Sequence, residues 1–180
     1  MSRTVKRVST STRRGRTSPP VLKIQIDGAA RGNPGPAGIG AVLTDESGHK
    51  LREISLYLGN ATNNVAETCA LIIALQEALK MGRVQVSVFT DSELLARQVS
   101  GDYRVKDPRL QWLHVLIRQL IEGFNRFSIQ HVPRTKNKQA DRFANRAVTD
   151  GLRRHPRSHP PKQSISPDTS PVTSSQPTFW

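Results

Sequence analysis

The chain has 180 residues, enough for about one domain, and 36% of them are hydrophobic, enough for one core. Its formal net charge of +13 favours a polyanionic partner, nucleic acid first, although two solvated basic tails would explain the same balance. The single cysteine, Cys69, excludes an internal disulfide, and no apolar run approaches the ~20 residues that span a membrane. We therefore expect a reducing compartment, the cytoplasm, and no membrane partner. We also expect the protein to be a monomer.

Most of the excess positive charge lies at the two ends of the chain. Residues 1–20 carry six Lys and Arg and no acid, and residues 153–180 carry four against Asp168 alone. We expect residues 1–20 and 152–180 to be disordered tails, the second rich in Pro and Ser, around one domain at residues 21–151. The Arg-, Ser- and Thr-rich N-terminal tail also has the composition of an organelle transit peptide, so both interpretations stay open.

Between the tails, hydrophobic periodicity predicts an α/β domain with the element order βββαβααβα. Strands with alternating apolar residues are expected at residues 21–27, 38–44, 51–59, 84–90 and 126–132. Helices with apolar residues three and four apart are expected at residues 64–81, 91–99, 108–124 and 137–149, the last ending near Gly151. The first three strands form an antiparallel meander. The fourth and fifth follow helical crossovers, which predicts that they run parallel to the first in a mixed sheet.

Four carboxylates fall at comparable places in these elements. Asp27 ends the first strand and Asp91 ends the fourth, so in a parallel pair they would lie together at the carboxyl edge of the sheet, where α/β sheets bind ligands. Glu67 is expected in the first turn of the first helix, and Asp141 in the second turn of the last. Two charges at ~4 Å repel by about 4 kcal/mol at an effective dielectric near 20, so such a cluster needs cations. Oxygen ligands suit Mg²⁺ or Mn²⁺ rather than zinc.

Each acid also has an interpretation that involves no catalysis. Asn64 and Glu67 have the spacing of a helix capping box, with Asn64 as the N-cap. Asp91 is in place to cap the helix that it precedes, and Asp141 to pair with a neighbouring base on a solvated helix face. Asp27 is the hardest to explain in this way, because a carboxylate that closes a buried apolar strand needs a partner.

Four short motifs follow one another along the expected domain. They are Asp27-Gly28 with Gly32-Asn33-Pro34-Gly35-Pro36, then Thr62-Asn63-Asn64-Val65-Ala66-Glu67, then Thr90-Asp91-Ser92, and finally Asn137-Lys138-Gln139-Ala140-Asp141-Arg142-Phe143-Ala144. With these motifs the chain resembles type 1 ribonuclease H over about residues 21–151. The resemblance implies the ribonuclease H-like fold, a five-stranded mixed sheet of strand order 3-2-1-4-5 with helices on both faces.

The resemblance also implies an enzyme, an endonuclease that hydrolyses the RNA strand of RNA–DNA hybrids and leaves 5′-phosphate and 3′-hydroxyl ends. Asp27, Glu67, Asp91 and Asp141 would be the catalytic acids. They would hold two Mg²⁺ ions, or Mn²⁺, on either side of the scissile phosphate, with Asp27 bridging both. His131 has the spacing of the family's auxiliary histidine, although it is also explained as an ordinary histidine at a strand end.

The family's contacts to nucleic acid fall on a second set of residues. Contacts to RNA 2′-hydroxyls are implied for Gly28, Ala29 and Asn63. Contacts to the DNA strand or a base edge are implied for Asn33, Thr62 and Asn64. Turn chemistry is the alternative explanation for Asn33 and Asn63.

The chain departs from the family pattern in its contacts to the substrate. Glu93 stands where the best-studied members carry a glutamine that contacts RNA. The six residues between Gly101 and Pro108 leave no room for the extra helix and basic protrusion that hold the DNA strand in some members. We expect part of that contact to come from the two basic tails together with Tyr103, Arg104 and Lys106.

Two other functions remain compatible with the sequence. One is a non-cleaving module that binds hybrids or double-stranded RNA on the same fold, and the presence of all four acids argues against it. The other is a different nuclease of the superfamily, such as an exonuclease or junction resolvase. The Asn-Asn-x-x-Glu and Gly-Asn-Pro-Gly contexts of the acids argue against that alternative.

Overall fold

The computed structural model describes residues 20–155, which form five strands and four helices. The strands are β1 (Leu22–Ala30), β2 (Gly35–Thr44), β3 (Lys50–Ala61), β4 (Gln85–Thr90) and β5 (Arg126–His131). The helices are α1 (Asn63–Lys80), α2 (Glu93–Ser100), α3 (Pro108–Glu122) and α4 (Lys138–Arg154), with a 3₁₀ turn at Arg134–Lys136. Apart from residues 20 and 152–155, the two predicted tails and the transit-peptide interpretation lie outside the described residues. Residues 152–154 were predicted to belong to the C-terminal tail, and they form the last turn of α4 instead. No helix in the described range is both long enough and apolar enough to cross a membrane.

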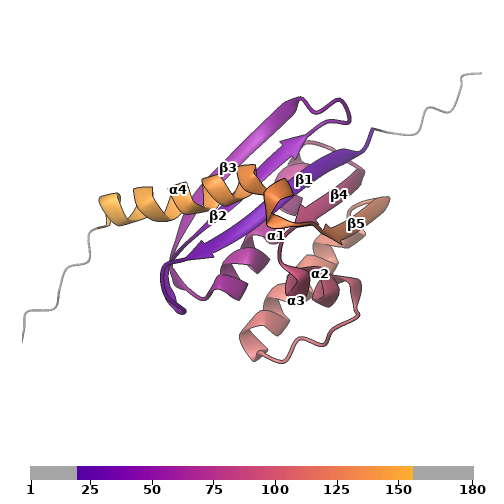
Figure 1. The fold of residues 1–180 in the computed structure, drawn as a ribbon. Coiled ribbons are helices and arrows are strands. Elements are labelled where there is room, and N and C mark those ends of the chain that lie inside the picture. Colours follow the sequence, from indigo (N-terminus) through magenta and orange to yellow (C-terminus); the bar gives the residue numbers. More distant parts are fainter. Residues whose placement is uncertain (1–19, 156–180) are drawn as a thin grey trace, which may run out of the picture.

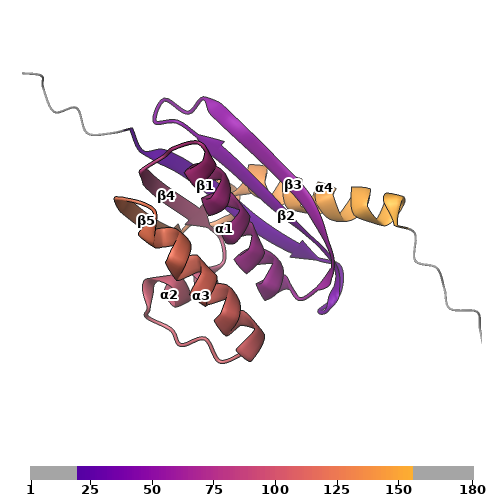
Figure 2. The same cartoon turned by 180° about the vertical axis from the view of Figure 1, so that it is seen from behind.

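The strands form one mixed sheet in the order β3-β2-β1-β4-β5. β1, β2 and β3 are antiparallel neighbours, and β4 and β5 run parallel to β1. α4 lies across one face of β1–β3, and α1 and α3 cover the opposite face (Figures 1 and 2). The predicted fold class, strand order and strand directions are therefore confirmed.

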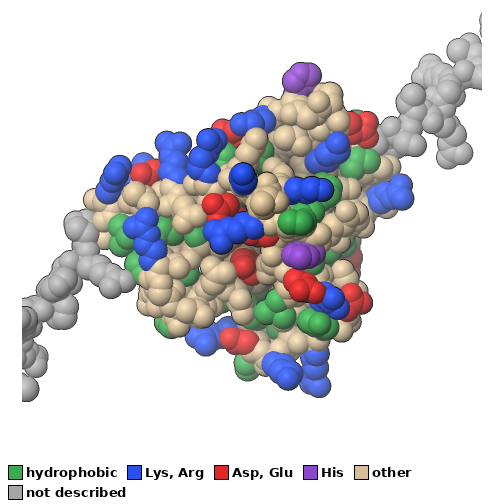
Figure 3. Space-filling view, in the orientation of Figure 1, with side chains coloured by type: hydrophobic (Ala, Val, Ile, Leu, Met, Phe, Trp, Pro, Cys, Tyr) green, Lys and Arg blue, Asp and Glu red, His purple; other side chains and the backbone are tan. Residues whose placement is uncertain are grey.

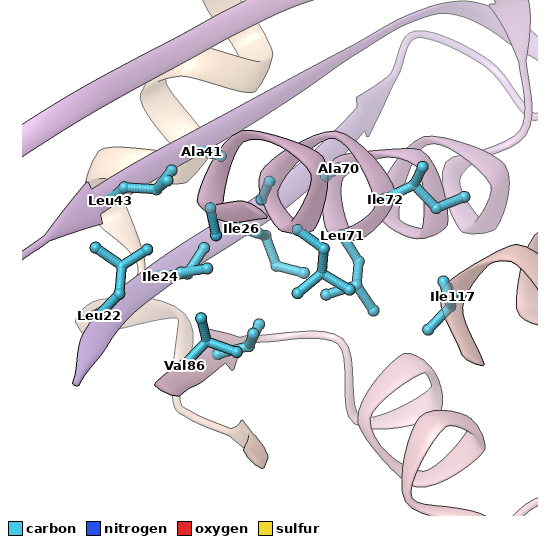
Figure 4. Close-up of a cluster of buried hydrophobic side chains, with 14 of the residues drawn as sticks. Leu22, Ile24, Ile26, Ala41, Leu43, Ala70, Leu71, Ile72, Val86 and Ile117 are labelled. Carbon is cyan, nitrogen blue, oxygen red and sulfur yellow. The ribbon is translucent and has the colours of Figure 1, made fainter. Parts of the chain in front are cut away.

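The core lies between the sheet and α1. Alternate residues of β1, namely Leu22, Ile24 and Ile26, are fully buried and face Leu71 and other apolar side chains of α1 (Figure 4). The parallel register pairs Ile26 with Thr90 as the last pair between β1 and β4. Asp27 and Asp91 each follow one residue later, so the packing of the core places both acids at the same edge of the sheet.

Several predicted element boundaries are wrong. β1 does not end at Asp27 but pairs with β2 as far as Ala30, because β2 begins early enough to supply partners for these residues. α1 begins at Asn63, with Thr62 as the N-cap whose side chain accepts from the Val65 N–H. The predicted capping box of Asn64 and Glu67 is therefore not formed.

α4 passes the predicted stop at Gly151 and continues to Arg154. Gly151 is buried, and a Cβ there would lie 2.1 Å from the Tyr57 ring. This glycine lets the helix pack against β3 and does not end it.

Two glycines of β2 set the position of α4 on the sheet. A Cβ at Gly40 would lie 2.1 Å from the Ala140 carbonyl oxygen, and one at Gly38 would lie 2.7 Å from the Ala147 Cβ. The close approach buries Ala140, Phe143 and other apolar residues of the helix. It also holds the first turn of α4, which carries Asp141, over the end of β1.

Candidate active site

An open hollow of about 230 Å³ lies at the carboxyl edge of β1 and β4. The four acids singled out in the sequence, Asp27, Glu67, Asp91 and Asp141, all line it, together with Gly28, Ala29, Ala30, Asn63, Arg134 and Asn145. Figure 3 shows acidic side chains gathered near the centre of this face, next to α4, with basic side chains around them. The fold thus brings together four carboxylates from β1, α1, the end of β4 and α4.

Asp27 is the most deeply placed of the four, with 8% of its surface exposed. Burial is the main reason that its pKa rises from 3.8 to about 8. The negative charges of Asp91, Asp141 and Glu67 raise this pKa further, while Arg134 lowers it. The positive charge of Arg134 is therefore too small to offset the burial of Asp27 and the three neighbouring carboxylates.

Glu67 is held by the close approach of β1, by Asn63 of its own helix and by Ser92, the N-cap of α2. Gly28 of β1 lets α1 approach closely, since a Cβ there would lie 2.2 Å from the Glu67 backbone nitrogen. The Asn63 amide donates to one carboxylate oxygen at 2.9 Å, and the Ser92 hydroxyl donates to the other at 2.5 Å. Burial raises the pKa of Glu67 although these hydrogen bonds oppose the shift, and the charge of Asp91 adds to it.

Asp91 does not cap α2, because the Ser92 side chain accepts from the Leu95 N–H and takes that role. The Asp91 carboxylate instead accepts from the Asn137 side-chain amide at 2.7 Å. The same amide donates to the Ile26 carbonyl at 2.8 Å, and Asn137 is fully buried. One side chain thereby ties together β1, the end of β4 and the start of α4.

Asp141 lies in the first turn of α4 rather than the predicted second turn, and the Arg134 guanidinium donates to it. This ion pair raises the pKa of Arg134. The alternative in which Asp141 pairs with a base of its own helix is therefore wrong, since Arg134 precedes α4.

As the carboxylates stand, no three His, Cys, Asp or Glu side chains within residues 20–155 are arranged to hold a metal ion. Asp141 is turned to Arg134, and Glu67 to Asn63 and Ser92. The donor set nevertheless fits a hard divalent cation, because it consists of carboxylates and because Asp27 is buried without enough positive charge. A cation would supply that charge, and Asp141 would then exchange Arg134 for it.

Comparisons with known proteins agree with this geometry. The family model described as "Reverse transcriptase-like" matches residues 25–147. Ribonuclease HI of Halobacterium salinarum is 44% identical over 125 residues, which are 69% of this chain and 63% of that protein. The chain belongs to the type 1 ribonuclease H family. A bifunctional protein of Mycobacterium tuberculosis is 45% identical over 126 residues, but these are only 35% of its length.

Solved ribonuclease H structures share the fold over nearly their whole length. RNase H1 of Halobacterium salinarum has a TM-score of 0.71 at 42% identity, and the match covers 72% of this chain and 98% of that one. LC11-RNase H1, solved in complex with an RNA/DNA hybrid, has a TM-score of 0.70 at 45% identity, covering 73% and 99%. The described part of the chain thus forms a ribonuclease H domain. The chain spans about a third to two thirds of the length of the longer relatives.

The residues expected to touch RNA lie at the hollow of this ribonuclease H domain. Gly28, Ala29 and Asn63 line it. Asn33 accepts from the Asn63 backbone N–H at 3.2 Å, so it positions the start of α1. Thr62 lines a second, largely apolar hollow of about 490 Å³, with Pro34, Asn60, Ala61, Val65, Arg109 and Leu113. Asn64 is exposed in the first turn of α1.

The other predicted residues lie outside both hollows. His131 is exposed at the end of β5, where it pairs with Thr90. Tyr103, Arg104 and Lys106 are exposed on the connection between α2 and α3. Glu93 forms an ion pair with Arg97 at 2.7 Å, and the Arg97 guanidinium lies 5.0 Å from the centre of the Tyr103 ring.

Sequence reasoning missed four polar residues at the hollow: Ser92, Arg134, Asn137 and Asn145. Ser92 and Asn137 stand inside the third and fourth motifs, which is the only signal that could have found them. Arg134 and Asn145 lie outside the four motifs, so no motif marks them. Arg134 donates to the Asp141 carboxylate and Asn145 to the Asp141 carbonyl, and these contacts become visible only in the folded structure.

Proposed function

We propose that the protein is an endoribonuclease that hydrolyses the RNA strand of RNA–DNA hybrids and leaves 5′-phosphate and 3′-hydroxyl ends. The observation that carries this proposal is the convergence of four carboxylates from four elements on one open hollow. Membership of the family supports it, as does the related LC11-RNase H1 that was solved with a bound hybrid. A hydrolase of this kind needs positioned charge rather than a covalent nucleophile, which agrees with a site made of acids.

Asp27, Glu67, Asp91 and Asp141 would hold two Mg²⁺ ions, with Mn²⁺ as an alternative. Bound there, such ions supply the charge that activates a water and offsets the charge on the leaving 3′ oxygen. The chain's own part is to keep the acids in place. Asn137 orients Asp91, while the close contact at Gly28 and the hydrogen bonds from Asn63 and Ser92 orient Glu67.

Arg134 would act in the same site without binding the ions. It neutralises Asp141 when no cation is present. If Asp141 held a cation, the Arg134 guanidinium would be free at the edge of the hollow to donate to a phosphate oxygen. His131, exposed next to the end of β4, is the proposed auxiliary group for proton transfer or product release.

The hybrid would be recognised from both of its strands. Backbone amides at Gly28 and Ala29, and the Asn63 side chain, would contact RNA 2′-hydroxyls, the group that distinguishes RNA from DNA. Asn33, Thr62 and Asn64 would contact the DNA strand. The exposed residues Tyr103, Arg104 and Lys106, and the basic tails, would add contacts that depend on salt. We propose that the protein works as a monomer in the cytoplasm.

A panel of end-labelled duplexes tests the function. A DNA duplex with an internal ribonucleotide stretch in one strand should be cut only within that stretch, in Mg²⁺ or Mn²⁺, and EDTA should stop the reaction. Cleavage of the all-DNA duplex but not of the ribonucleotide stretch would indicate another nuclease of the superfamily. Binding without cleavage in either metal would indicate a non-catalytic module. Double-stranded RNA and single-stranded RNA complete the panel as specificity controls.

A further inference from the structure

α4 has three faces with different partners. The buried face, formed by Ala140, Phe143, Ala144, Ala147, Val148 and Gly151, packs on the sheet. A second face turns to the hollow, which Asp141 and Asn145 line, and one turn further on Thr149 accepts from the Arg31 guanidinium at 2.7 Å. The third face points to solvent and carries basic residues. We call it the α4 track and define it by Lys138, Arg142, Arg146 and Arg153, all of them exposed.

The spacing of these residues makes one continuous stripe. Lys138, Arg142 and Arg146 are four residues apart, and Arg153 follows seven later, which are the intervals that keep side chains on one side of an α-helix. At 1.5 Å per residue the stripe is about 22 Å long. Its N-terminal end adjoins Asp141, so the track starts at the proposed cleavage site and leads away from it. Figure 3 shows basic side chains along α4 on the same face as the central acids.

The charges of the α4 track are incompletely neutralised. Some exposed bases of other elements have an acidic partner of their own, as in the pairs Arg52–Glu77 at 2.9 Å and Arg97–Glu93 at 2.7 Å. Within the described part of the chain, Lys138 and Arg142 have no carboxylate within 4 Å. Arg146 and Arg153 share the single acid Asp150, at 3.4 and 3.9 Å.

Helix stability does not explain this pattern. Like charges four residues apart on a helix are destabilising by about 0.2–0.5 kcal/mol per pair. Lys138 stands at the N-terminal end of α4, where the helix dipole disfavours a positive charge. Arg153 stands in the last turn, where the dipole favours a base, and Arg146 pairs with Asp150, so the cost falls on Lys138 and Arg142, the two bases nearest the hollow. Unpaired bases that border an acidic hollow are suited to a polyanion that extends beyond the hollow.

We propose that the α4 track binds the sugar–phosphate backbone of an RNA–DNA hybrid outside the cleavage site. This inference rests on the proposed function, since it takes the hybrid to be seated at the hollow. The connection between Gly101 and Pro108 is too short to carry a basic protrusion, so other cationic surfaces would hold any duplex beyond the hollow, and the α4 track is the one that starts at the hollow. The track contributes affinity for long hybrids through charge, and it does not select sequence.

The test replaces three track residues in the full chain, as Arg142→Gln, Arg146→Gln and Arg153→Gln together. Binding is measured by fluorescence anisotropy in EDTA, so that it does not depend on cleavage. We compare a hybrid longer than two helical turns with one shorter than a single turn. For the long hybrid we expect about tenfold weaker binding and a salt-dependence slope smaller by about 2 to 3, since each neutralised phosphate contributes about 0.9. The loss should be several-fold smaller for the short hybrid.

A matched control removes the same charge from the opposite end of the sheet and from α3. It combines Lys23→Gln, Arg118→Gln and Arg126→Gln, three exposed positions. This variant should bind the long hybrid with an affinity within about twofold of the wild type, because charges far from the bound duplex are largely screened by salt. Equal losses in the two triple variants, or no loss in the track variant, would overturn the proposal. Thermal unfolding of both variants confirms that each is folded.

A further variant separates charge from shape, with Arg142→Lys, Arg146→Lys and Arg153→Lys together. It should retain the affinity for the long hybrid, because a lysine neutralises a phosphate as a point charge. A loss as large as that of the glutamine variant would contradict a charge-based track. Cleavage of the short hybrid in Mg²⁺ tests the proposed function separately. A protein that cuts nothing but loses affinity in the track variant would refute the function and leave the track standing.

Discussion

At the scale of single residues, the hollow is an arrangement of acids that the fold keeps close together against their mutual repulsion. Asp27 lies deepest, and its pKa of about 8 reflects burial first and the neighbouring charges second. The fold relieves this cost only in part, because Arg134, the one base that lines the hollow within residues 20–155, is paired with Asp141. The repulsion and burial of these acids should therefore lower the free energy of unfolding by an amount that can be measured.

The first prediction concerns Asp27→Asn in metal-free buffer. The folded-state pKa is raised above 3.8, so the stability contributed by the neutral carboxyl is fully present below that pH and is lost as pH rises through about 8. The asparagine side chain carries no charge at any pH, so the variant should be more stable than the wild type near pH 8. One pK unit corresponds to about 1.4 kcal/mol, so the shift from 3.8 to about 8 sets an upper bound of about 6 kcal/mol. We expect a difference of a few kcal/mol, measured by denaturant unfolding.

Two controls accompany this measurement. The difference between variant and wild type should shrink as the pH falls toward 4, because protonating the buried carboxyl costs less free energy the closer the pH lies to its unfolded-state pKa of 3.8. Added Mg²⁺ should stabilise the wild type more than the variant, because ligand binding to the folded state adds stability. A difference that is the same at pH 4 and pH 8 would show that Asp27 is not the titrating group.

The second prediction concerns Asn137→Ala. The substitution leaves the Ile26 carbonyl without its buried donor and releases Asp91. Unfolding should cost about 1–3 kcal/mol less than for the wild type, and cleavage should fall as well. Asn145→Ala is the matched control for stability, because Asn145 is exposed and its amide donates only to a backbone oxygen one turn away. Similar destabilisation by both substitutions would contradict the role given to Asn137.

The acids could be found from the sequence, whereas the residues that hold them could not. Asp27 and Asp91 follow segments in which apolar residues alternate, and that pattern can be read directly from the sequence. Asn137 acts across 46 residues to Asp91 and across 111 residues to Ile26, and such contacts depend on the finished sheet. Arg134 lies seven residues from Asp141, in a 3₁₀ turn that hydrophobic periodicity does not reveal.

At the scale of elements, the site depends on how closely α4 and α1 approach the sheet. Both contacts use glycine: Gly40 and Gly38 under α4, and Gly28 under α1. These strand glycines are needed for close packing, because a Cβ at any of the three positions would overlap the backbone or a Cβ of the facing helix.

The third prediction concerns Gly40→Ala. The new Cβ would lie 2.1 Å from the Ala140 carbonyl oxygen, so α4 must move away from β2 and carry Asp141 with it. We expect destabilisation of about 1–3 kcal/mol or more, measured by thermal unfolding, together with lower cleavage activity. Gly123→Ala is the control, since its new Cβ would meet the flexible end of Leu79 at 2.9 Å. A Gly40→Ala protein as stable and active as the control would show that this contact does not position the site.

The order and type of the elements could be predicted from periodicity, but several ends could not. Gly151 was expected to stop the last helix, and it instead makes room for the Tyr57 ring. A glycine that ends a helix and a glycine that permits close packing look alike in a sequence. The cap of α1 was placed at Asn64 instead of Thr62 for a similar reason, since both residues favour the N-cap position.

At the scale of the whole molecule, the charge is arranged around the hollow and at the chain ends. The described domain presents carboxylates at one edge of the sheet, with the basic face of α4 beside them (Figure 3). The four motifs are enough to predict the family, the strand order and the four acids. The basic face of α4 was not predicted, because its bases lie on a helix whose orientation on the sheet is set by Gly38 and Gly40.

The fourth prediction concerns the two tails. Residues 20–155 alone should bind a hybrid more weakly than the full chain, because the N-terminal tail alone carries six Lys and Arg. The difference in affinity should be largest at low salt and should shrink as the salt concentration rises. Anisotropy titrations over a salt series measure both affinities. Equal affinity of the two proteins at every salt concentration would show that the tails contribute nothing to binding.

The central claim is that the four carboxylates perform cleavage, and Asp91→Asn tests it most directly. The variant keeps an oxygen that can accept from Asn137, so the fold and hybrid binding should persist. Cleavage of a DNA duplex with an internal ribonucleotide stretch in Mg²⁺ should fall by at least about a hundredfold relative to the wild type. Cleavage by the folded variant at the wild-type rate would contradict the assignment of the active site.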